Sequence, residues 1–403
     1  MINVAILGFG TVGSGVAEVL TRNQDAIDAR VGQPVRLKYI VDIRDFPDSP
    51  FADRFVKDFA VVESDPEINV VVETIGGAKI AREFTTRALK AGKSVVTSNK
   101  ELVATHGYEL LQLAKEHGAN YLFEASVGGG IPILRPLVND LAANEIEEIT
   151  GILNGTTNYI LTRMIRAGLT FEQALKEAQE NGYAEQDPTA DVEGWDACRK
   201  ICILSALAFG QHIYPEQVPT EGISQVTLED VAYAASKGYK IKLLGRCIKV
   251  TDDKICAYTA PHLVYQENPL YCVEDVFNAV AVRGNAVGDV MFYGRGAGKL
   301  PTASAVVADI SDLAKDIKTD RRIAWGPGAP DLVASSDILN SRWYVRVKDS
   351  QETAKAAFGE IELLTRDQAP ADEVAFLTAV MTQPELEEKL GDLEAESVFR
   401  VLD

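Results

Sequence analysis

The chain has 403 residues, of which 46% are hydrophobic and 25% charged, and its formal net charge at pH 7 is −19. This composition is typical of a globular protein, and the length suggests two or three domains. The negative charge argues against nucleic acid and anionic membranes as partners, because both bind through basic patches, but it does not exclude a small anionic ligand.

The cysteines and the N-terminus indicate the compartment. There are five cysteines and no CxxC pair, which disfavours a disulfide framework or a zinc site; we expect buried, reduced thiols in a cytoplasmic protein. They are Cys198, Cys202, Cys247, Cys256 and Cys272. The first ten residues, MINVAILGFG, lack a basic region and are predicted to form a strand rather than a signal peptide. No apolar run reaches the ~20 residues of a membrane-spanning helix.

The first part of the chain is predicted to be a parallel α/β sheet. Runs with the character of buried strands occur at residues 2–7, 37–43, 68–77 and 93–101, and a helical stretch at 81–92 separates the last two. Strands that alternate with helices favour a Rossmann-type dinucleotide-binding domain.

A glycine-rich segment, GFGTVGSG at 8–15, follows the first strand and opens a helix, as the G-x-G-x-x-G fingerprint requires. Gly8 permits the tight turn, Gly10 lets the backbone approach a pyrophosphate, and Gly13 permits close helix–strand packing. The helix start would hold the phosphate charge. We therefore expect a dinucleotide here, also contacted by the intervening residues Phe9, Thr11 and Val12.

The second strand is followed by two residues, Asp42 and Arg44, that favour different cofactors. Asp42, 29 residues after Gly13, favours a free ribose 2′-hydroxyl and hence NAD; the spacing exceeds the usual ~20 and requires an extended connection. Arg44 could pair with a 2′-phosphate and hence favours NADP. The sequence leaves both possibilities open.

The pattern changes after residue 124. Long helical patterns are predicted at about 157–181 and 194–210, and β-like runs alternate between 240 and 295. A glycine turn at 294–302 precedes a helix that is expected to return the chain to the nucleotide domain. A soft boundary follows at 320–340.

The remaining residues, 340–403, have a βαββαβ pattern, which is the ferredoxin-like arrangement. The fold class is therefore α/β with three expected parts. A Rossmann-type domain takes residues 1–130 plus about 295–325, an α+β domain takes 131–294, and a small ferredoxin-like domain takes 340–403.

Six segments, taken together and in this order, resemble homoserine dehydrogenases over about residues 1–325. They are VVETIGG (71–77), GKSVVTSNKELVA (92–104), FEASVGGGIPI (123–133), GILNGTTNYIL (151–161), GYAEQDPTADVEGWDACRK (182–200) and GRGAGKLPTASAV (294–306). The resemblance implies reversible conversion of L-homoserine and NAD(P)+ to L-aspartate 4-semialdehyde and NAD(P)H, a step toward threonine, isoleucine and methionine. It also implies a homodimer or higher homo-oligomer that pairs through the middle-domain sheet.

The same resemblance assigns the site. The substrate residues are matched by Glu185, Asp196 and Lys200, and a second functional lysine by Lys100. A monovalent cation, usually sodium, would be bound by the glycine-rich loop through Glu124 and the backbone carbonyls of Val127, Gly129 and Ile131. The C-terminal part resembles an ACT domain, but its loop KDSQETAKAAFG has no glycine before the helix, so amino-acid inhibition is left open.

The chemistry of the residues agrees with this assignment. Oxidation of an alcohol needs a group that takes the hydroxyl proton, and a lysine can do this because burial and neighbouring charges move its pKa. Asp196 and Lys200 are i,i+4 on a helix from about Gly194, and Lys200 is assigned as the proton donor or acceptor. Lys100 would hold the substrate or the cofactor.

The other candidates have supporting roles. Glu185 can bind the substrate ammonium, with Asp191 as a secondary contact. Asp187 and Glu193 are interpreted as turn, cap or solvated residues. NGTTNY at 154–159 is interpreted as placing backbone and side-chain amides near the nicotinamide or substrate. It can equally be a capped turn that opens a helix, with Thr156 or Thr157 as N-cap, and the two interpretations are compatible. Further residues that would line the cofactor are Thr97, Ser98 and Gly298.

Two alternatives remain open at this level. One is a sensor of dinucleotides and amino acids built on an inactive dehydrogenase, which the complete set of lysines and carboxylates disfavours. The other is a related NAD(P)-dependent oxidoreductase acting on another small amino acid. An aspartate-semialdehyde dehydrogenase of the phosphorylating type is disfavoured, because no cysteine lies in a nucleophile setting.

Overall fold

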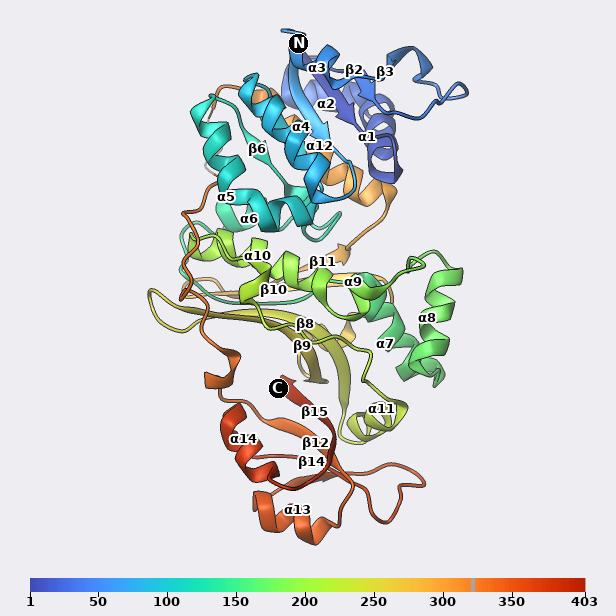
Figure 1. Cartoon of the computed structure of the whole chain (residues 1–403), viewed down its shortest axis with the longest axis vertical. Coiled ribbons are helices and arrows are strands. Elements are labelled where there is room, and N and C mark those ends of the chain that lie inside the picture. The colour runs from blue at the N-terminus through green and yellow to red at the C-terminus, as the bar shows by residue number, and fades with distance from the viewer. Residues whose placement is uncertain (320–322, 403) are drawn as a thin grey trace. The chain divides into compact units, whose positions relative to one another are not determined.

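Each of two units contains its own β-sheet in the computed structural model, which describes residues 1–319 and 323–402 (Figure 1). The first unit comprises Met1–Glu145, Cys202–Pro215 and Gly294–Ala329. The second comprises Ile146–Ile201, Glu216–Tyr293 and Pro330–Asp403. The expected boundary at 320–340 includes residues 320–322, which lie outside the described residues.

The sheet of the first unit has the strand order β3-β2-β1-β4-β5-β6, and all of its pairings are parallel. This is the order of a dinucleotide-binding fold, so the Rossmann-type prediction is confirmed. The strands are β1 (Ile2–Leu7), β2 (Val35–Val41), β3 (Phe55–Val56), β4 (Ile68–Glu73), β5 (Ser94–Thr97) and β6 (Tyr121–Leu122). The helices of this unit include α1 (Thr11–Arg22), α2 (Gln24–Val31), α3 (Phe59–Ser64), α4 (Ala78–Lys90), α5 (Lys100–Glu116), α6 (Leu134–Val138) and α12 (Lys299–Lys315).

Helix α2 explains the long interval before Asp42. It follows α1 directly and ends at Gly32, which adopts a left-handed conformation with φ of 81°. This additional helix occupies the extended connection that the sequence required between the glycine loop and β2.

Helix α12 packs against α1 within the first unit, as the expected return of the chain requires (Figure 1). The contact is close at Gly15, where a Cβ atom would lie 2.8 Å from the Lys299 carbonyl oxygen and 3.1 Å from the Ala303 Cβ. A larger residue at position 15 would therefore separate the helix that begins at the glycine loop from its neighbour.

The second unit is built on a nine-stranded sheet with the order β11-β10-β7-β8-β9-β15-β12-β14-β13. Its first five strands are β7 (Ile146–Ile152), β8 (Tyr239–Lys249), β9 (Ile255–Tyr265), β10 (Phe277–Gly284) and β11 (Gly288–Arg295). Four helices accompany them in the sequence: α7 (Gly155–Ala167), α8 (Phe171–Glu180), α9 (Thr189–Val192) and α11 (Leu228–Ala235). Helix α10 (Trp195–Phe209) has residues in both units.

The C-terminal residues have the βαββαβ order that the sequence predicts. The elements are β12 (Trp343–Val347), α13 (Gln351–Phe358), β13 (Glu362–Leu364), β14 (Val374–Leu377), α14 (Gln383–Leu390) and β15 (Ala395–Leu402). Their sheet does not stand alone, because β15 pairs in parallel with β9 through Arg400 opposite His262. The C-terminal strands therefore continue the sheet of the middle region.

Three predictions differ from the structure. The helix predicted at 157–181 is two helices, because Gly168 ends α7 at φ 63° and Thr170 begins α8 with a capping box. The N-cap of α7 is Asn154 rather than Thr156 or Thr157. Cys272 is exposed on a 3-10 turn, whereas the other four cysteines are buried as expected.

No helix among the described residues is long and apolar enough to cross a bilayer.

Candidate active site

The glycine loop has the geometry that its three glycines predict. Gly8 has φ of 90°, a conformation that L-residues rarely adopt. A Cβ at Gly13 would lie 1.9 Å from the Gly8 carbonyl oxygen, so only glycine permits this approach of helix and strand. A Cβ at Gly10 would meet nothing within 4 Å, so the backbone is accessible to a ligand there. Phe9, Thr11 and Val12 accordingly surround a turn that can hold a pyrophosphate at the start of α1.

The Asp42 carboxylate is occupied by backbone and arginine donors. Its Oδ2 accepts from the Phe9 N–H at 2.7 Å and from Arg44 Nη2 at 2.9 Å. Its Oδ1 accepts from the Arg44 N–H at 2.9 Å and from Arg44 Nε at 3.1 Å. The Arg44 hydrogen bonds are the main reason that the pKa of Asp42 lies well below its ordinary value. Asp42 and Arg44, which favour different cofactors in the sequence analysis, thus form one ion pair beside the glycine loop.

Glu73, which the sequence analysis missed, links the loops after β4 and β5. Its carboxylate accepts from the Ile75 N–H at 2.6 Å and from the Thr97 hydroxyl at 2.5 Å, and the Thr97 oxygen accepts from the Asn99 N–H. Asn99 is the N-cap of α5, whose first residue is Lys100. An acid at the end of the apolar run VVVE was the available signal for this residue. Glu73 thus fixes the chain that leads through Thr97 and Ser98 to Lys100.

Burial raises the pKa of Glu73 from 4.5 to about 7, in spite of its hydrogen bonds. The folded protein therefore holds this proton more tightly than the unfolded chain. The associated stability is complete below pH 4.5 and is lost as the pH rises to about 7. Glu73→Gln should remove this loss, which amounts to about 3 kcal/mol. The free energies of unfolding at pH 5 and 8 would measure it. Glu83→Gln, an exposed change on α4, is the control, and an unchanged pH slope in Glu73→Gln would contradict the assignment.

Glu124 is buried, and its carboxylate caps the short helix α6. Oε1 accepts from the N–H groups of Ile133 and Leu134, and Oε2 accepts from that of Arg135 at 2.8 Å. Arg135 also pairs with Asp309 at 2.6 Å, and Asp309 Oδ2 accepts from the Glu124 N–H. Burial raises the pKa of Asp309 to about 7.

The glycine-rich loop after Glu124 turns sharply. Gly128 and Gly129 have φ of 70° and 54°, and a Cβ at Gly129 would lie 2.4 Å from the Gly296 carbonyl oxygen. The Ile131 N–H donates to the Gly128 carbonyl at 2.8 Å. In the described chain we find no hydrogen-bond donor to the carbonyls of Val127, Gly129 or Ile131. Carbonyl oxygens are suitable ligands for a hard cation, so these three groups fit the monovalent ion that the sequence analysis expects.

The acid-rich segment contains a buried ion pair in the second unit. Lys200 Nζ donates to Asp196 Oδ2 at 2.6 Å and to the Leu153 carbonyl at 2.7 Å. Both side chains are buried, with 9% and 3% of their surface exposed. A routine pair at i,i+4 would be solvated, whereas burial of this pair holds the lysine in one place. The sequence prediction that the two residues share a helix face is confirmed.

Asn154 joins this pair to Asp191. Its Nδ2 donates to Asp196 Oδ2 at 2.8 Å and to Asp191 Oδ1 at 2.7 Å. Asp187 instead accepts from the Thr189 N–H and hydroxyl, as expected for a turn residue. Glu185 is exposed, and within the described part of the second unit no hydrogen bond joins its carboxylate to Lys200. The structure thus brings together Asp191, Asp196 and Lys200, while Lys100 and the cofactor candidates, including Gly298 at the start of α12, belong to the first unit.

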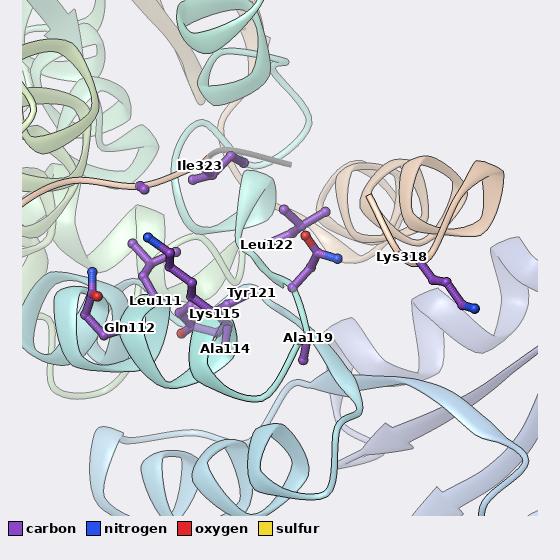
Figure 2. Close-up of a pocket in the computed structure, with 12 residues that line it drawn as sticks. Leu111, Gln112, Ala114, Lys115, Ala119, Tyr121, Leu122, Lys318 and Ile323 are labelled. Carbon is purple, nitrogen blue, oxygen red and sulfur yellow. The ribbon is translucent and has the colours of Figure 1, made fainter. Parts of the chain in front are cut away.

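A separate pocket of about 260 Å³ lies in the first unit (Figure 2). It is lined by the end of α5, the loop before β6, and residues near 318 and 323, with Lys115 and Lys318 among them. Ligands of such folds bind at the carboxyl ends of the strands, whereas this pocket lies at the amino end of β6. It is therefore not the predicted cofactor site.

Comparison with known proteins matches the chain to one family. The profile of the homoserine dehydrogenase NAD-binding domain matches residues 8–124, and that of homoserine dehydrogenase matches residues 132–311. The homoserine dehydrogenase of Bacillus subtilis (strain 168) is 44% identical over 357 residues, which cover 86% of this chain and 82% of the relative.

Solved structures agree with the sequence comparison. A homoserine dehydrogenase from Thiobacillus denitrificans matches with a TM-score of 0.90 and 38% identity, over 100% of this chain and 98% of the other. A hyperthermophilic archaeal homoserine dehydrogenase in complex with NADPH matches with a TM-score of 0.66 and 31% identity, over 79% and 98% of the two chains. The chain therefore belongs to the homoserine dehydrogenase family, whose members are oxidoreductases acting on a CH–OH group.

Proposed function

We propose that the chain converts L-homoserine and NAD(P)+ reversibly to L-aspartate 4-semialdehyde and NAD(P)H, with Lys200 as the proton-transferring group. The observation that carries this assignment is the buried contact of Lys200 with Asp196 and the Leu153 carbonyl. The glycine loop from Gly8 to Gly13 would hold the dinucleotide, which would supply the acceptor for the hydride of the alcohol carbon. Lys200 takes the hydroxyl proton in that direction and returns it to the oxygen in the reverse direction.

Other residues bind the two ends of the substrate. Homoserine carries an ammonium and a carboxylate, so it needs both acidic and basic partners. Asp191 and Glu185 supply negative charge near the start of α10, and we assign the substrate ammonium to them. Lys100, at the first position of α5, supplies positive charge for the substrate carboxylate or for the cofactor. Asp196 keeps Lys200 oriented.

For the cofactor we propose NADP(H), because Asp42 has no acceptor capacity left for a ribose hydroxyl. A carboxylate offers about four lone-pair sites, and four N–H groups already occupy those of Asp42. Its negative charge is also balanced by Arg44, which reduces repulsion of a 2′-phosphate. The Arg44 side chain is 59% exposed and is available to such a phosphate.

Arg44→Ala tests this proposal. Removal of the guanidinium should leave an uncompensated carboxylate that repels a 2′-phosphate and accepts a 2′-hydroxyl. We expect the ratio of kcat/KM for NADP+ to that for NAD+ to fall by about 10-fold or more, the value of one charge-assisted hydrogen bond. Arg30→Ala, an exposed change of the same charge on α2, should leave the ratio unchanged. An unchanged ratio in Arg44→Ala would assign cofactor choice to other residues.

We also propose that the loop from Glu124 to Ile131 binds a sodium ion. The capping bonds to α6 occupy much of the Glu124 carboxylate. The carbonyls of Val127, Gly129 and Ile131 would then supply most of the ligands. The ion would fix the loop that adjoins Arg295 and Gly296.

For assembly we propose a homodimer or a larger homo-oligomer. Strand β11 is the edge of the nine-stranded sheet, and the hairpin that contains it exposes Val287, Met291 and Tyr293. An edge strand with exposed apolar side chains is an exception among soluble proteins unless another chain covers it. We assign the ferredoxin-like C-terminal part to association as well.

The direct test is turnover of L-homoserine by the purified protein with NADP+ and with NAD+, each with and without sodium. Production of reduced cofactor would support the proposed reaction, and a dependence on sodium would support the cation. Cofactor binding without turnover of homoserine or related four-carbon amino acids would instead indicate a sensor. Turnover of another amino acid but not of homoserine would indicate a different substrate.

A further inference from the structure

Every polar position of the Asn154 carboxamide is in use. Its Oδ1 accepts from the Thr157 N–H at 2.8 Å and thereby caps α7. Its two N–H groups donate to Asp191 Oδ1 at 2.7 Å and to Asp196 Oδ2 at 2.8 Å. Asn154 is itself buried, with 5% of its surface exposed. One amide thus connects a helix start and two carboxylates from the acid-rich segment.

The same oxygen of Asp196 is also the acceptor of Lys200. Asp196 Oδ2 is therefore shared between the Lys200 ammonium at 2.6 Å and the Asn154 amide at 2.8 Å. A neutral hydrogen-bond donor stabilises the negative charge of the carboxylate that it contacts, and this weakens the attraction between the carboxylate and a neighbouring cation. The residue before Asn154, Leu153, accepts from Lys200 through its carbonyl. The chain at the start of α7 therefore reaches Lys200 directly through the Leu153 carbonyl and indirectly through the bond from Asn154 to Asp196.

We propose that Asn154 is a positioning residue that sets the proton affinity of Lys200 through Asp196 and the direction of Asp191 toward the substrate amine. It reaches the substrate through these neighbours rather than directly. The inference rests on the proposed dehydrogenase reaction. The NGTTNY segment would then have a role besides capping the helix. The Asn154 side-chain oxygen caps α7, and the side-chain nitrogen holds Asp191 and Asp196 in place.

Two substitutions separate these roles. Asparagine, aspartate and serine are comparably good N-caps, so Asn154→Asp and Asn154→Ser both retain the cap of α7. Asn154→Asp removes both donors and adds a negative charge next to Asp196. Asn154→Ser stays neutral and offers at most one donor. Asn268→Ser changes an N-cap asparagine of the same unit on a 3-10 turn outside the acid-rich segment, and it serves as the matched control.

We expect kcat/KM for homoserine to fall by about 10-fold or more in Asn154→Ser and further in Asn154→Asp. With the amide donor gone, Asp196 holds the Lys200 proton more tightly. The rise of homoserine oxidation with pH should therefore move upward by about one unit, and by more in Asn154→Asp. Dissociation constants for NADP+ should change little. The melting temperature should fall in both variants, and further in Asn154→Asp, which buries a charge without a partner. Asn268→Ser should match the wild type in all of these measurements.

A direct titration makes the test independent of activity. The ¹³C resonance of the Lys200 ε-carbon, assigned by its absence in Lys200→Arg, should titrate at higher pH in both Asn154 variants than in the wild type. A lower melting temperature with an unmoved titration and an unmoved pH profile would overturn the proposal and leave Asn154 as a helix cap only. A wild type that lacks turnover while Lys200 still shifts would refute the reaction and not the positioning role.

Discussion

Lys200→Ala is expected to lower kcat for homoserine oxidation by 100-fold or more, since this is about the smallest effect of losing a general acid–base group. The structure places the ammonium between Asp196 Oδ2 and the Leu153 carbonyl, and a water that filled this place in the variant would lack the charge and the proton affinity of the amine. Steady-state rates with saturating cofactor would measure the loss.

The neighbouring arginine supplies the control. Arg199→Ala removes a half-buried cation from the same turn of α10 and should change kcat by only a few-fold. Lys200→Ala also leaves the Asp196 carboxylate buried without its cation, so its melting temperature has to be measured alongside. Full activity in a folded Lys200→Ala protein would exclude our mechanism and make Lys100 the candidate.

The largest effect on stability is expected for Asp230→Ala, with a loss of about 3–5 kcal/mol in the free energy of unfolding. Asp230 on α11 is fully buried and accepts from Arg346 Nε at 2.8 Å, the Tyr344 hydroxyl at 2.9 Å and the Ser397 hydroxyl at 2.9 Å. Arg346 also pairs with Glu373 at 3.1 Å. Truncation of Asp230 to alanine would remove a carboxylate that balances the positive charge of the buried Arg346 guanidinium.

Urea unfolding of the second unit would measure this loss. Glu180→Ala breaks an exposed i,i+4 pair with Lys176 at 3.9 Å and should cost no more than about 0.5 kcal/mol. If Asp230→Ala cost less than 1 kcal/mol, the network between α11 and the C-terminal strands would be a minor contributor to stability.

Local sequence patterns predict much of this protein and fail at identifiable places. The parallel sheet, the glycine loop and the C-terminal βαββαβ order follow from apolar periodicity and glycine spacing, which are local properties. The break between α7 and α8 was missed, although Gly168 marks it, because the apolar period continues through it.

In the candidate site, too, some contacts are predictable from the sequence and others are not. Asp196 and Lys200 share a helix face, so their contact is predictable from an interval of four residues. Asn154 reaches Asp191 and Asp196 from a different helix, and no interval in the sequence encodes that approach. Whether hydrogen bonds occupy all lone pairs of the Asp42 carboxylate likewise depends on the side-chain conformation of Arg44. Such contacts require the tertiary structure.

The pairing of β15 with β9 has a consequence for how the protein is made. The ribosome releases β9 well before β15, since the whole stretch 266–394 lies between them. During that interval the edge of β9 around His262 lacks its final partner, and an open strand edge can pair with other chains. The nascent second unit therefore depends on β15 to join β9 to the C-terminal strands, and the time for which β9 is exposed during synthesis is set by the length of the intervening chain.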